Sequence, residues 1–402
     1  MSSSPVSRRD FLLAAGTVAL GASLAPAVVA QPSKAADVGA ASEPPSDRKI
    51  RMGIVGGGFG AAFHWHQDPN CIVEAVSDLR DDRRQHLMSV YQCGKSYESL
   101  EKLILDPKID AVAVFTEAPN HVRHCVAVMD TGKHCLCAVP AGLTLEECRE
   151  LIDAKERNGV RYMMAETSYY RWPTITARKL YEDGKFGSLV YTEGEYYHPG
   201  IAHEKDGLSY WNGKRTWRHG YPPMLYPTHS TAFYVGVSRE RLVEVCCVGE
   251  TSEDPAFHDN LYHNPFANAS ALFKTSRGHI MRCNVMWEVW AHGERAQWFG
   301  DSMSMFMDSW SGQPYLISTA AGETITSDPD YWHMVPEAMR IDSGHGASHP
   351  FITHEFTMAL VEDREPAVNV YEAVAMTAPG IVAHASALKG GEQMKVPSFD
   401  KV

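Results

Sequence analysis

The feature that most constrains this chain is a glycine-rich turn placed directly after an apolar run. Residues 50–55 predict a buried β-strand, and Gly56-Gly57-Gly58-Phe59-Gly60-Ala61 follows it. Gly56, Gly58 and Ala61 match G-x-G-x-x-A, the fingerprint of a turn that binds dinucleotides. Gly56 permits the tight turn, Gly58 lets the backbone approach a pyrophosphate, and the small Ala61 allows close packing. We expect a helix after this turn, with the phosphates at its positive end.

An acidic residue follows this turn at the spacing that a ribose contact requires. A second apolar run, residues 72–76, ends just before Asp78, and about 20 residues separate such a carboxylate from the glycines in dinucleotide-binding folds. Because a carboxylate repels a 2′-phosphate, NAD is the expected cofactor, with NADP as an alternative because Arg80 is close in sequence. Asp78 alternatively caps the next helix. The predicted cofactor contacts in this region are Gly56, Gly58, Phe59, Gly60 and Asp78.

Short apolar runs alternate with amphipathic stretches up to Glu166, a pattern typical of βαβ units and a parallel sheet. Further strands are predicted at residues 109–115, 134–139 and 162–165. Pro119 and Asn120 favour a loop after the first of these, at the sheet edge where ligands bind. A capping box of Thr144 and Glu147 predicts the start of a helix that runs through Arg157.

The pattern changes after Trp172, where long strands replace the alternation of strands and helices. Strands are predicted at residues 189–197, 242–249, 269–275, 279–289 and 302–307. Several of them alternate apolar and polar residues, as in an antiparallel sheet with one covered face. Helices predicted at 350–362 and 370–388 close the chain.

The N-terminus has the pattern of a twin-arginine (Tat) signal peptide. Arg8-Arg9 precedes an apolar stretch, residues 12–29, and small residues around Ala30 offer a cleavage point. A chance Arg-Arg pair before a membrane anchor is the alternative. We expect residues 1–30 to be the signal, 31–48 to be a Pro/Ala/Ser-rich linker, and the Tat translocon to be a partner during export. The mature protein is then periplasmic or secreted, without membrane contact.

Composition narrows the classes of partner. The chain has 402 residues, a net charge of -12 and no basic cluster, so neither nucleic acid nor anionic lipid is expected. Its nine cysteines lack metal-type spacing and are interpreted as small buried hydrophobes, so no metal is predicted. Free thiols also agree with export by a route whose cargo folds in a reducing compartment.

Three motifs together resemble the Gfo/Idh/MocA family: the fingerprint followed by His64, the Thr116 to His124 segment, and Gly132-Lys133-His134 ahead of a strand ending at Pro140. The resemblance runs from about Lys49 to the C-terminus. It implies an α/β fold with a Rossmann parallel sheet in residues 49–170, an α/β domain with a large, mostly antiparallel sheet in 171–402, and a homo-oligomer. It also implies further cofactor contacts at Thr116, Pro119, Asn120, His121, Ala138 and Pro140.

Aromatic and imidazole side chains are densest between the predicted strands of the second half. They are Tyr196-Tyr197-His198-Pro199, Trp211, Trp217-Arg218-His219 and Tyr226-Pro227-Thr228-His229. Aromatic faces stack on sugar rings while a few polar groups bind the hydroxyls, so a carbohydrate is the expected substrate. For Trp211 and Trp217, a place in the core is an equally good interpretation.

The Tyr-Pro-Thr-His motif resembles one branch of the family, the NAD-dependent α-N-acetylgalactosaminidases. Val139-Pro140-Ala141, Glu146-Glu147-Cys148-x-Glu150-Leu151 and Met163-Met164-x-Glu166-x-x-x-Tyr170 resemble it too. In that branch, oxidation of a ring hydroxyl acidifies the adjacent C–H, the aglycone is eliminated, water adds, and the hydride returns. The resemblance implies a role for His229 at the oxidised hydroxyl and for Tyr170 or Tyr226 as acid/base. His345 and His349 are weaker candidates for substrate contact.

The chain departs from the family at two positions. Dehydrogenase members have Glu-Lys-Pro where this chain has Ala138-Val139-Pro140, and an Asp where it has Leu225. The usual proton relay is therefore absent, and the glutamate of the glycosidase branch is absent at Ala138 as well. Glu166 is a candidate replacement.

Export and cofactor together favour a redox-neutral reaction. Because little NAD is free outside the cytoplasm, an exported enzyme is expected to retain its cofactor and regenerate it in each cycle, as in glycoside cleavage through a transient ketone. Two alternatives stay open: an ordinary sugar or polyol dehydrogenase, and a non-catalytic protein that binds NAD or sugar.

Overall fold

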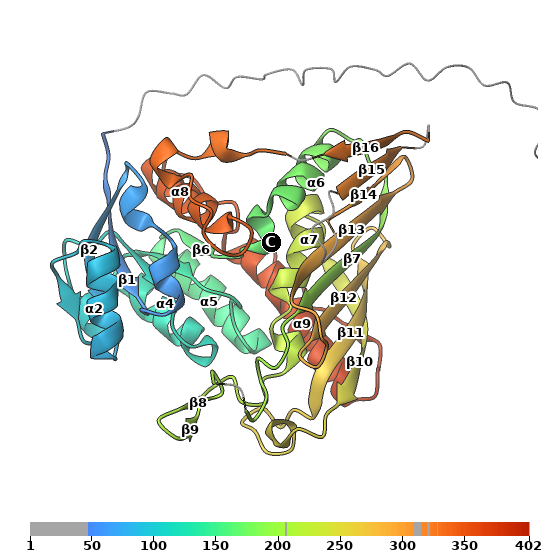
Figure 1. Cartoon of the computed structure of the whole chain (residues 1–402), viewed down its shortest axis with the longest axis horizontal. Helices are drawn as coiled ribbons and strands as arrows, with labels where there is room; N and C mark the ends of the chain where they lie inside the picture. The colour runs from blue at the N-terminus through green and yellow to red at the C-terminus, as the bar shows by residue number, and fades with distance from the viewer. Residues whose placement is uncertain (1–46, 206, 309–314, 320–321, 328, 402) are drawn as a thin grey trace, which may run out of the picture. The chain divides into compact units, whose positions relative to one another are not determined.

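The computed structural model describes residues 47–205, 207–308, 315–319, 322–327 and 329–401 (Figure 1). Residues from Ser46 onward form one compact unit. The predicted signal peptide and nearly all of the linker lie outside the described residues, and the predicted domain boundaries stay predictions. Among the described residues, no helix has the length and apolarity needed to cross a membrane.

The first half of the unit is built on a six-stranded sheet of order β3-β2-β1-β4-β5-β6. Every neighbouring pair is parallel, which confirms the predicted Rossmann sheet. The order reverses between β1 and β4, where the carboxyl ends of strands leave a crevice for ligands. The strands are β1 Ile50–Val55, β2 Cys71–Ser77, β3 Ser96–Tyr97, β4 Ala111–Val114, β5 His134–Cys137 and β6 Tyr162–Met164.

The helices of this half are α2 Asp81–Val90, α3 Leu100–Leu103, α4 His121–Asp130 and α5 Leu145–Asn158. The predicted capping box is confirmed, because Thr144 accepts from the Glu147 N–H and the Glu147 side chain accepts from the Thr144 N–H. The prediction of a helix directly after the glycine turn is wrong. Two 3₁₀ turns stand there, η1 Phe59–Ala62 and η2 Trp65–Gln67, because His64 adopts a left-handed conformation (φ 53°) that ends the first turn.

The second half is built on a nine-stranded sheet of order β16-β15-β14-β13-β7-β12-β11-β10-β17. The pair β7–β12 is parallel and the other pairs are antiparallel, so the predicted mostly antiparallel sheet is confirmed. The strands are β7 Leu189–Tyr197, β10 Leu242–Thr251, β11 Phe266–Thr275, β12 Ile280–Met286, β13 Gly293–Gly300, β14 Met303–Phe306, β15 Tyr315–Thr319, β16 Thr324–Ser327 and β17 Met394–Lys395. A separate hairpin consists of β8 Tyr210–Trp211 and β9 Lys214–Arg215.

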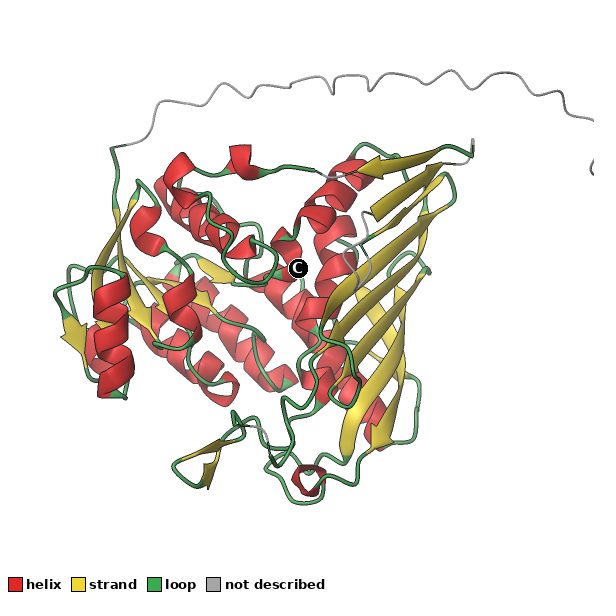
Figure 2. Cartoon of the chain, in the orientation of Figure 1, coloured by secondary structure: helices red, strands yellow, loops and turns green. Residues whose placement is uncertain are grey.

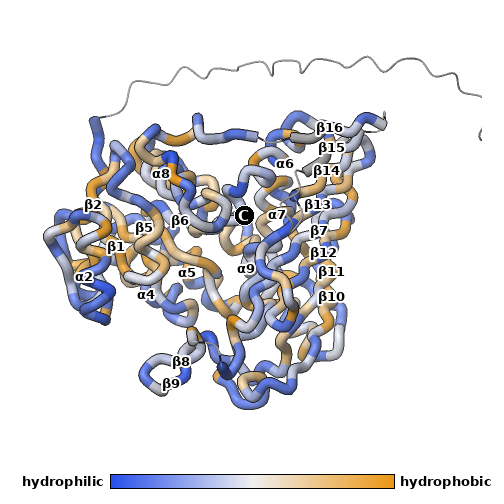
Figure 3. The backbone as a smooth tube through the Cα atoms, viewed as in Figure 1, coloured by the Kyte–Doolittle hydropathy of each residue, from blue (hydrophilic) through white to orange (hydrophobic). Residues whose placement is uncertain are grey.

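Helices fill the space between the two sheets (Figure 2). They are α6 Trp172–Glu182, α7 Thr228–Ser238, α8 Ser348–Val361 and α9 Val370–Leu388. Helix α7 is buried along its whole length and packs on β7, β12 and β13. Helix α9 packs on β10 of one sheet and on β6 and α5 of the other half. Apolar residues concentrate along β1 and along the helices between the sheets, which places the core there (Figure 3).

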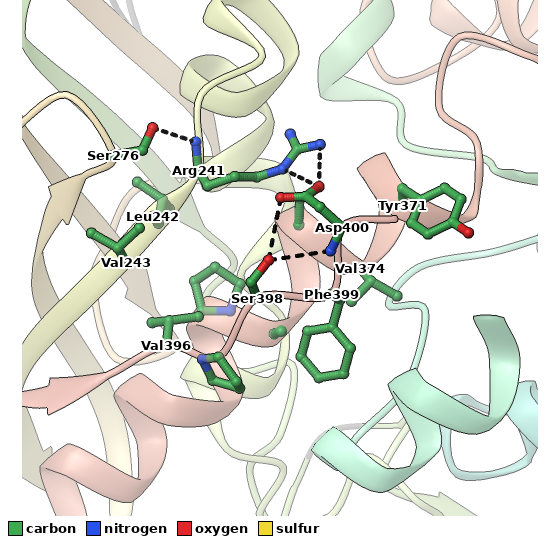
Figure 4. Close-up of a pocket in the computed structure, with 14 residues that line it drawn as sticks. Arg241, Leu242, Val243, Ser276, Tyr371, Val374, Val396, Ser398, Phe399 and Asp400 are labelled. Atoms are coloured by element: carbon green, nitrogen blue, oxygen red, sulfur yellow. Dashed lines mark hydrogen bonds and ion pairs between the residues drawn. The ribbon is translucent and has the colours of Figure 1, made fainter. Parts of the chain in front are cut away.

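The C-terminal tail crosses from the nine-stranded sheet to α5. Strand β17 pairs with the edge strand β10, Asp400 forms an ion pair with Arg241 at 2.8 Å, and Phe399 lies 4.8 Å below the guanidinium of Arg149 on α5. A largely apolar cavity of about 250 Å³ opens beside the tail, with Arg241 and Asp400 on one side and Phe399 on the other (Figure 4).

Candidate active site

The glycine turn has the shape of a dinucleotide cradle. Gly56 has a φ of 104°, and a Cβ there would lie 2.3 Å from the Phe115 carbonyl oxygen, so only glycine fits. At Gly58 a Cβ would meet nothing closer than the Arg83 guanidinium, at 3.6 Å. That open side leaves the backbone accessible to a pyrophosphate, and Arg83 supplies a positive charge next to it. The turn therefore fits NAD, and loop N–H groups rather than the N-terminus of an α-helix would hold the phosphates.

Asp78 lies at the end of β2 and holds the turn in place. One carboxylate oxygen accepts from the Gly57 N–H at 2.7 Å, and the other accepts from the Arg80 N–H at 2.8 Å. Each oxygen keeps a second acceptor site for a ribose hydroxyl. Helix α2 has Arg80 as its N-cap without a side-chain cap, so Asp78 is not that cap. The Arg80 guanidinium is paired with Asp82, which agrees with NAD rather than NADP.

The predicted contacts on the neighbouring loops divide into exposed and buried groups. Pro119 is exposed on the 3₁₀ turn η3, Ala118–Asn120, and Asn120 is partly exposed. His121 is buried, with its ring nitrogens 2.8 Å from the Pro140 carbonyl oxygen and 3.1 Å from that of Thr116. Its ring therefore joins the two loops and has no nitrogen left for a cofactor.

Ala138 and Pro140 lie at the end of β5. Both are buried, and the Val139-Pro140 peptide bond is cis. The Ala138 N–H donates to the Val114 carbonyl oxygen at 3.0 Å, which continues the sheet past the last residue of β5. The roles of both residues as cofactor contacts stay predictions.

The predicted catalytic histidine is part of a buried charged pair. His229, in the first turn of α7, places Nδ1 2.9 Å from Glu166 Oε1, and Glu166 is fully buried beyond the end of β6. The Ser168 N–H also donates to Glu166 Oε1 at 2.8 Å. The other ring nitrogen of His229, Nε2, has no hydrogen-bond partner among the described residues, yet it is not fully enclosed. This nitrogen is the one that a substrate can reach.

A second carboxylate extends this pair into a network that the sequence did not predict. Glu294, on β13, accepts from Arg171 through both oxygens, at 2.8 Å each. The Ser168 hydroxyl donates to Glu294 and lies 3.2 Å from His229 Nδ1. Two carboxylates, one guanidinium and one imidazole are thus held together in the interior, where each charge depends on the others.

The charges of the network follow from its geometry. Burial opposes ionisation of Glu166, but the facing His229 outweighs it and lowers the pKa of Glu166. Burial also opposes ionisation of Glu294, but the charge of Arg171 outweighs it and lowers the pKa of Glu294 to about 2. Burial disfavours the charged form of His229, yet Glu166 and Glu294 raise its pKa above the ordinary value. His229 is therefore held as an imidazolium whose Nε2–H points to the accessible side.

An aromatic wall surrounds His229. Tyr196 and Tyr226 lie 4.6 Å and 5.3 Å from its ring, and Trp287 lies 5.9 Å from Tyr196, as measured between ring centroids. Burial raises the pKa of Tyr226, and the charge of the neighbouring Arg218 opposes part of that rise. Partly exposed Tyr226 thus stands beside both His229 and a cation. Its predicted place in the site agrees with this geometry.

Tyr170 lies apart from this group. Its hydroxyl is fully enclosed and has no hydrogen-bond partner among the described residues. Burial raises its pKa, and its charged neighbours are Glu355, Arg178 and Arg239, none of which belongs to the His229 network. The structure therefore does not bring Tyr170 to His229, and its acid/base role stays a prediction.

The two weaker candidates, His345 and His349, lie against the glycine turn. Phe59 contacts both rings, with centroid distances of 5.3 Å and 5.4 Å. At the two departures from the family pattern, Ala138 and Leu225 are buried and carry no ionisable group.

The missed residues are Arg171, Ser168, Glu294 and Trp287. Glu294 belongs to β13, which has the alternation GERAQWFG but was not among the predicted strands. That alternation was the signal that a carboxylate here faces inward, in register with Ala296 and Trp298. Glu294, which Arg171 and Ser168 both contact, lies more than a hundred residues from them in sequence, so no local pattern reveals these contacts.

Comparison with known proteins identifies the first half. Residues 50–166 match the model of the oxidoreductase family with an NAD-binding Rossmann fold, GFO_IDH_MocA. This segment belongs to the Gfo/Idh/MocA family. The full chain is 24% identical to a glycosyl hydrolase family 109 protein of Solibacter usitatus, covering 98% of this chain and 97% of the relative. A protein of the same name from Streptomyces coelicolor is 21% identical, covering 100% and 96%.

Solved structures share the fold of this chain. A levoglucosan dehydrogenase in complex with NADH and levoglucosan superimposes with a TM-score of 0.73 at 19% identity, covering 87% of this chain and 100% of the other. An apo scyllo-inositol dehydrogenase from Lactobacillus casei has a TM-score of 0.68 at 12% identity, covering 88% and 99%. These likenesses show that the fold as a whole, with the Rossmann sheet and the second sheet, is shared with known structures.

Proposed function

We propose that this enzyme retains NAD and transiently oxidises a hydroxyl of a sugar, with glycoside cleavage as the net reaction. The observation that carries the proposal is the buried network of His229, Glu166 and Glu294 with its accessible Nε2–H. Relatives that align along the whole chain are named glycosyl hydrolase family 109 proteins, and the fold is that of sugar dehydrogenases. Both observations support chemistry at a sugar hydroxyl.

The residues of the site have distinct roles in this reaction. Bound NAD supplies a hydride acceptor, held by the glycine turn and Asp78. The His229 Nε2–H donates to the substrate oxygen and stabilises negative charge as a ketone forms, because the site is enclosed and the donor is already oriented. The ketone acidifies the adjacent C–H, which permits loss of the proton and the aglycone. Tyr226, beside Arg218, is the candidate to donate a proton to the leaving group.

A contact between distant segments supports retention of the cofactor. Trp211, on the β8–β9 hairpin, lies 5.4 Å from the Arg80 guanidinium, two residues after Asp78. The hairpin therefore reaches the part of the Rossmann half where the ribose of NAD binds. A contact of this kind slows release of the cofactor, as a reaction that regenerates NAD in each cycle requires.

We also propose export by the Tat pathway, with a periplasmic or secreted mature protein. The support is the Arg8-Arg9 motif before an apolar stretch. Replacing both arginines with lysine should keep the precursor in the cytoplasm, measured by cell fractionation and by cleavage of the signal. Unchanged export of that variant would contradict the proposal.

An ordinary sugar dehydrogenase is the second candidate, favoured by the likeness in fold to levoglucosan dehydrogenase. A non-catalytic binding protein is disfavoured by the His229 network, because buried charges bring a desolvation cost that sugar binding alone does not require.

The deciding experiment is to purify the protein without added cofactor, denature it and quantify nucleotide by mass spectrometry, then assay chromogenic glycosides. Near-stoichiometric NAD together with glycoside cleavage that needs no added NAD is the expected result. Release of NADH in proportion to turnover would favour the dehydrogenase. A protein that binds no NAD would overturn both.

A further inference from the structure

The proposed oxidation releases a proton from the substrate hydroxyl, and the site needs a group to accept it. Glu166, 2.9 Å from His229 Nδ1, and the nearby Glu294 raise the pKa of His229 and favour its charged form, which has no vacant nitrogen for that proton. Val139 and Leu225 carry no ionisable group. A further group that borders both the glycine turn and the His229 network is therefore a candidate for the acceptor.

A chain of hydrogen bonds fixes the tautomers of His345 and His349. His349 Nδ1 lies 3.1 Å from the Ala62 carbonyl oxygen, and a carbonyl oxygen only accepts, so Nδ1 carries the hydrogen. His349 is buried and stacked on Phe63, with centroids 4.5 Å apart, which favours its neutral form with a bare Nε2. That Nε2 lies 3.1 Å from His345 Nδ1, which must then be the donor. A neutral His345 is left with a bare Nε2.

The position of His345 suits a proton acceptor. His345 is exposed to solvent, and its ring packs on Phe59 of the glycine turn, with centroids 5.3 Å apart. The next residue, Gly346, approaches Arg171 so closely that a Cβ would lie 2.9 Å from the guanidinium. His345 thus stands between the cofactor cradle and the network that holds His229. Its electrostatic neighbours are Glu294, Glu166, His229 and Arg171.

We propose that His345 accepts the proton of the substrate hydroxyl through Nε2 and that His349 is a positioning residue that fixes its tautomer. This assignment rests on the proposed function. The O–H bond breaks and its proton goes to Nε2, the hydride leaves the same carbon for NAD, and a carbon–oxygen double bond forms. In the closing step the proton and the hydride return to the substrate.

The electrostatic surroundings support a neutral His345. Burial of part of the ring lowers its pKa to about 4, with Glu294 opposing the shift and with His229 and Arg171 adding to it. Burial and the adjacent His345 lower the pKa of His349 to about 3. His345 is therefore unprotonated at neutral pH while His229 is protonated, which separates the proton acceptor from the oxyanion-stabilising donor.

The first test is nitrogen NMR of the holoenzyme labelled at histidine, which reports tautomers independently of activity. We expect a hydrogen on Nδ1 and a bare Nε2 for His345 at neutral pH. In the His349→Gln variant this fixed tautomer should give way to a mixture. A His345 that is protonated at both nitrogens, or that carries its hydrogen on Nε2, would contradict the proposal.

The second test follows reduction of the bound cofactor after rapid mixing with a sugar. His345→Gln should slow that step on the order of 100-fold while NAD content and sugar affinity stay close to wild type. In His345→Gly, added imidazole should restore part of the rate, which a merely structural role would not allow. The control is His86→Gln, an exposed histidine on α2, which should match the wild type.

The outcomes separate the two proposals. Equal rates in the wild type and in His345→Gln would overturn the assignment of His345 and leave the proposed function standing. If the wild-type protein holds NAD but no sugar or glycoside reduces that NAD, the proposed function is overturned, and the assignment of His345 with it.

Discussion

At the residue scale, the site depends on charges that are buried together. His229 is charged because Glu166 and Glu294 face it, and Glu294 is charged because Arg171 binds both of its oxygens. Removing one member leaves the others with their desolvation cost and without a partner. Substitutions in this network therefore change both the stability of the fold and the protonation states of the remaining groups.

Glu294→Gln should destabilise the fold by about 3 kcal/mol, because the Arg171 guanidinium loses its carboxylate in the interior. The measurement is the free energy of unfolding from chemical denaturation. Glu193→Gln is the matched control on the same sheet, where a partly exposed pair with Arg282 contributes about 1 kcal/mol or less. Equal effects of the two variants would show that Glu294 is not paired as described.

The Glu166–His229 pair predicts how stability depends on pH. The pKa of His229 is raised in the fold, so its contribution is fully present below the unfolded pKa and is lost as pH rises through the folded pKa. The pKa of Glu166 is lowered, so its contribution is present above the unfolded pKa and is lost as pH falls through the folded pKa. His229→Gln should remove the alkaline loss from the curve of unfolding free energy against pH. An unchanged alkaline limb in that variant would argue against a raised pKa.

At the scale of elements, short loops rather than helices build the cofactor cradle. The turn after β1 continues as 3₁₀ turns, and the β8–β9 hairpin, from the other half of the chain, contacts Arg80, two residues after Asp78. The glycines of the turn have separate physical roles, and alanine substitutions distinguish them.

Gly58→Ala should fold normally but lose NAD, since its Cβ would project into open space beside Arg83. Gly56→Ala should lose about 2 kcal/mol of stability, because φ is 104° and the Cβ would meet the Phe115 carbonyl oxygen. Thermal unfolding and nucleotide content of the two purified variants check this contrast. If Gly58→Ala retained full NAD, the pyrophosphate would have to bind elsewhere.

Trp211→Ala should speed the loss of NAD by about fivefold, because the cation–π contact of the hairpin with Arg80 contributes about 1 kcal/mol. The measurement is the rate of NAD dissociation after dilution. Trp290→Ala serves as the control, since that tryptophan is fully exposed. Equal dissociation rates in the two variants would remove the support that the hairpin gives to cofactor retention.

At the scale of the whole molecule, one core joins the two sheets. Helix α9 packs on β10 at one end of the nine-stranded sheet and on β6 and α5 of the Rossmann half, and the C-terminal tail adds a second connection to α5. The buried residues of both halves belong to a single hydrophobic cluster. The halves should therefore not unfold independently.

We expect the residues after Ser46 to unfold in one cooperative transition that bound NAD shifts as a whole. Far-ultraviolet circular dichroism and tryptophan fluorescence should give coincident curves. Two separated transitions, with only the first responding to NAD, would show that the halves are independent.

Local patterns determined much of this fold. The strand and glycine turn at Ile50–Ala61, the capping box at Thr144 and the limits of α9 follow from short-range rules on turns, caps and periodicity, and the structure confirms them. The alternation after Trp172 predicted the mostly antiparallel sheet for the same reason. At His64 the backbone is left-handed, and the helix expected after the glycine turn did not form.

The sequence by itself determined the parallel sheet and the NAD cradle and singled out His229 as a candidate, because each depends on neighbours within a few residues or on a motif. Only the tertiary structure decided the charge of His229, since Glu166 lies 63 residues away in sequence and Glu294 reaches the network from β13. It also decided that His349 contacts Ala62, which directly follows the glycine turn and is 287 residues away in sequence. Tyr170, in contrast, has its charged neighbours in another part of the core. A pKa is set by charges and burial in space, and neither quantity is written in the local sequence.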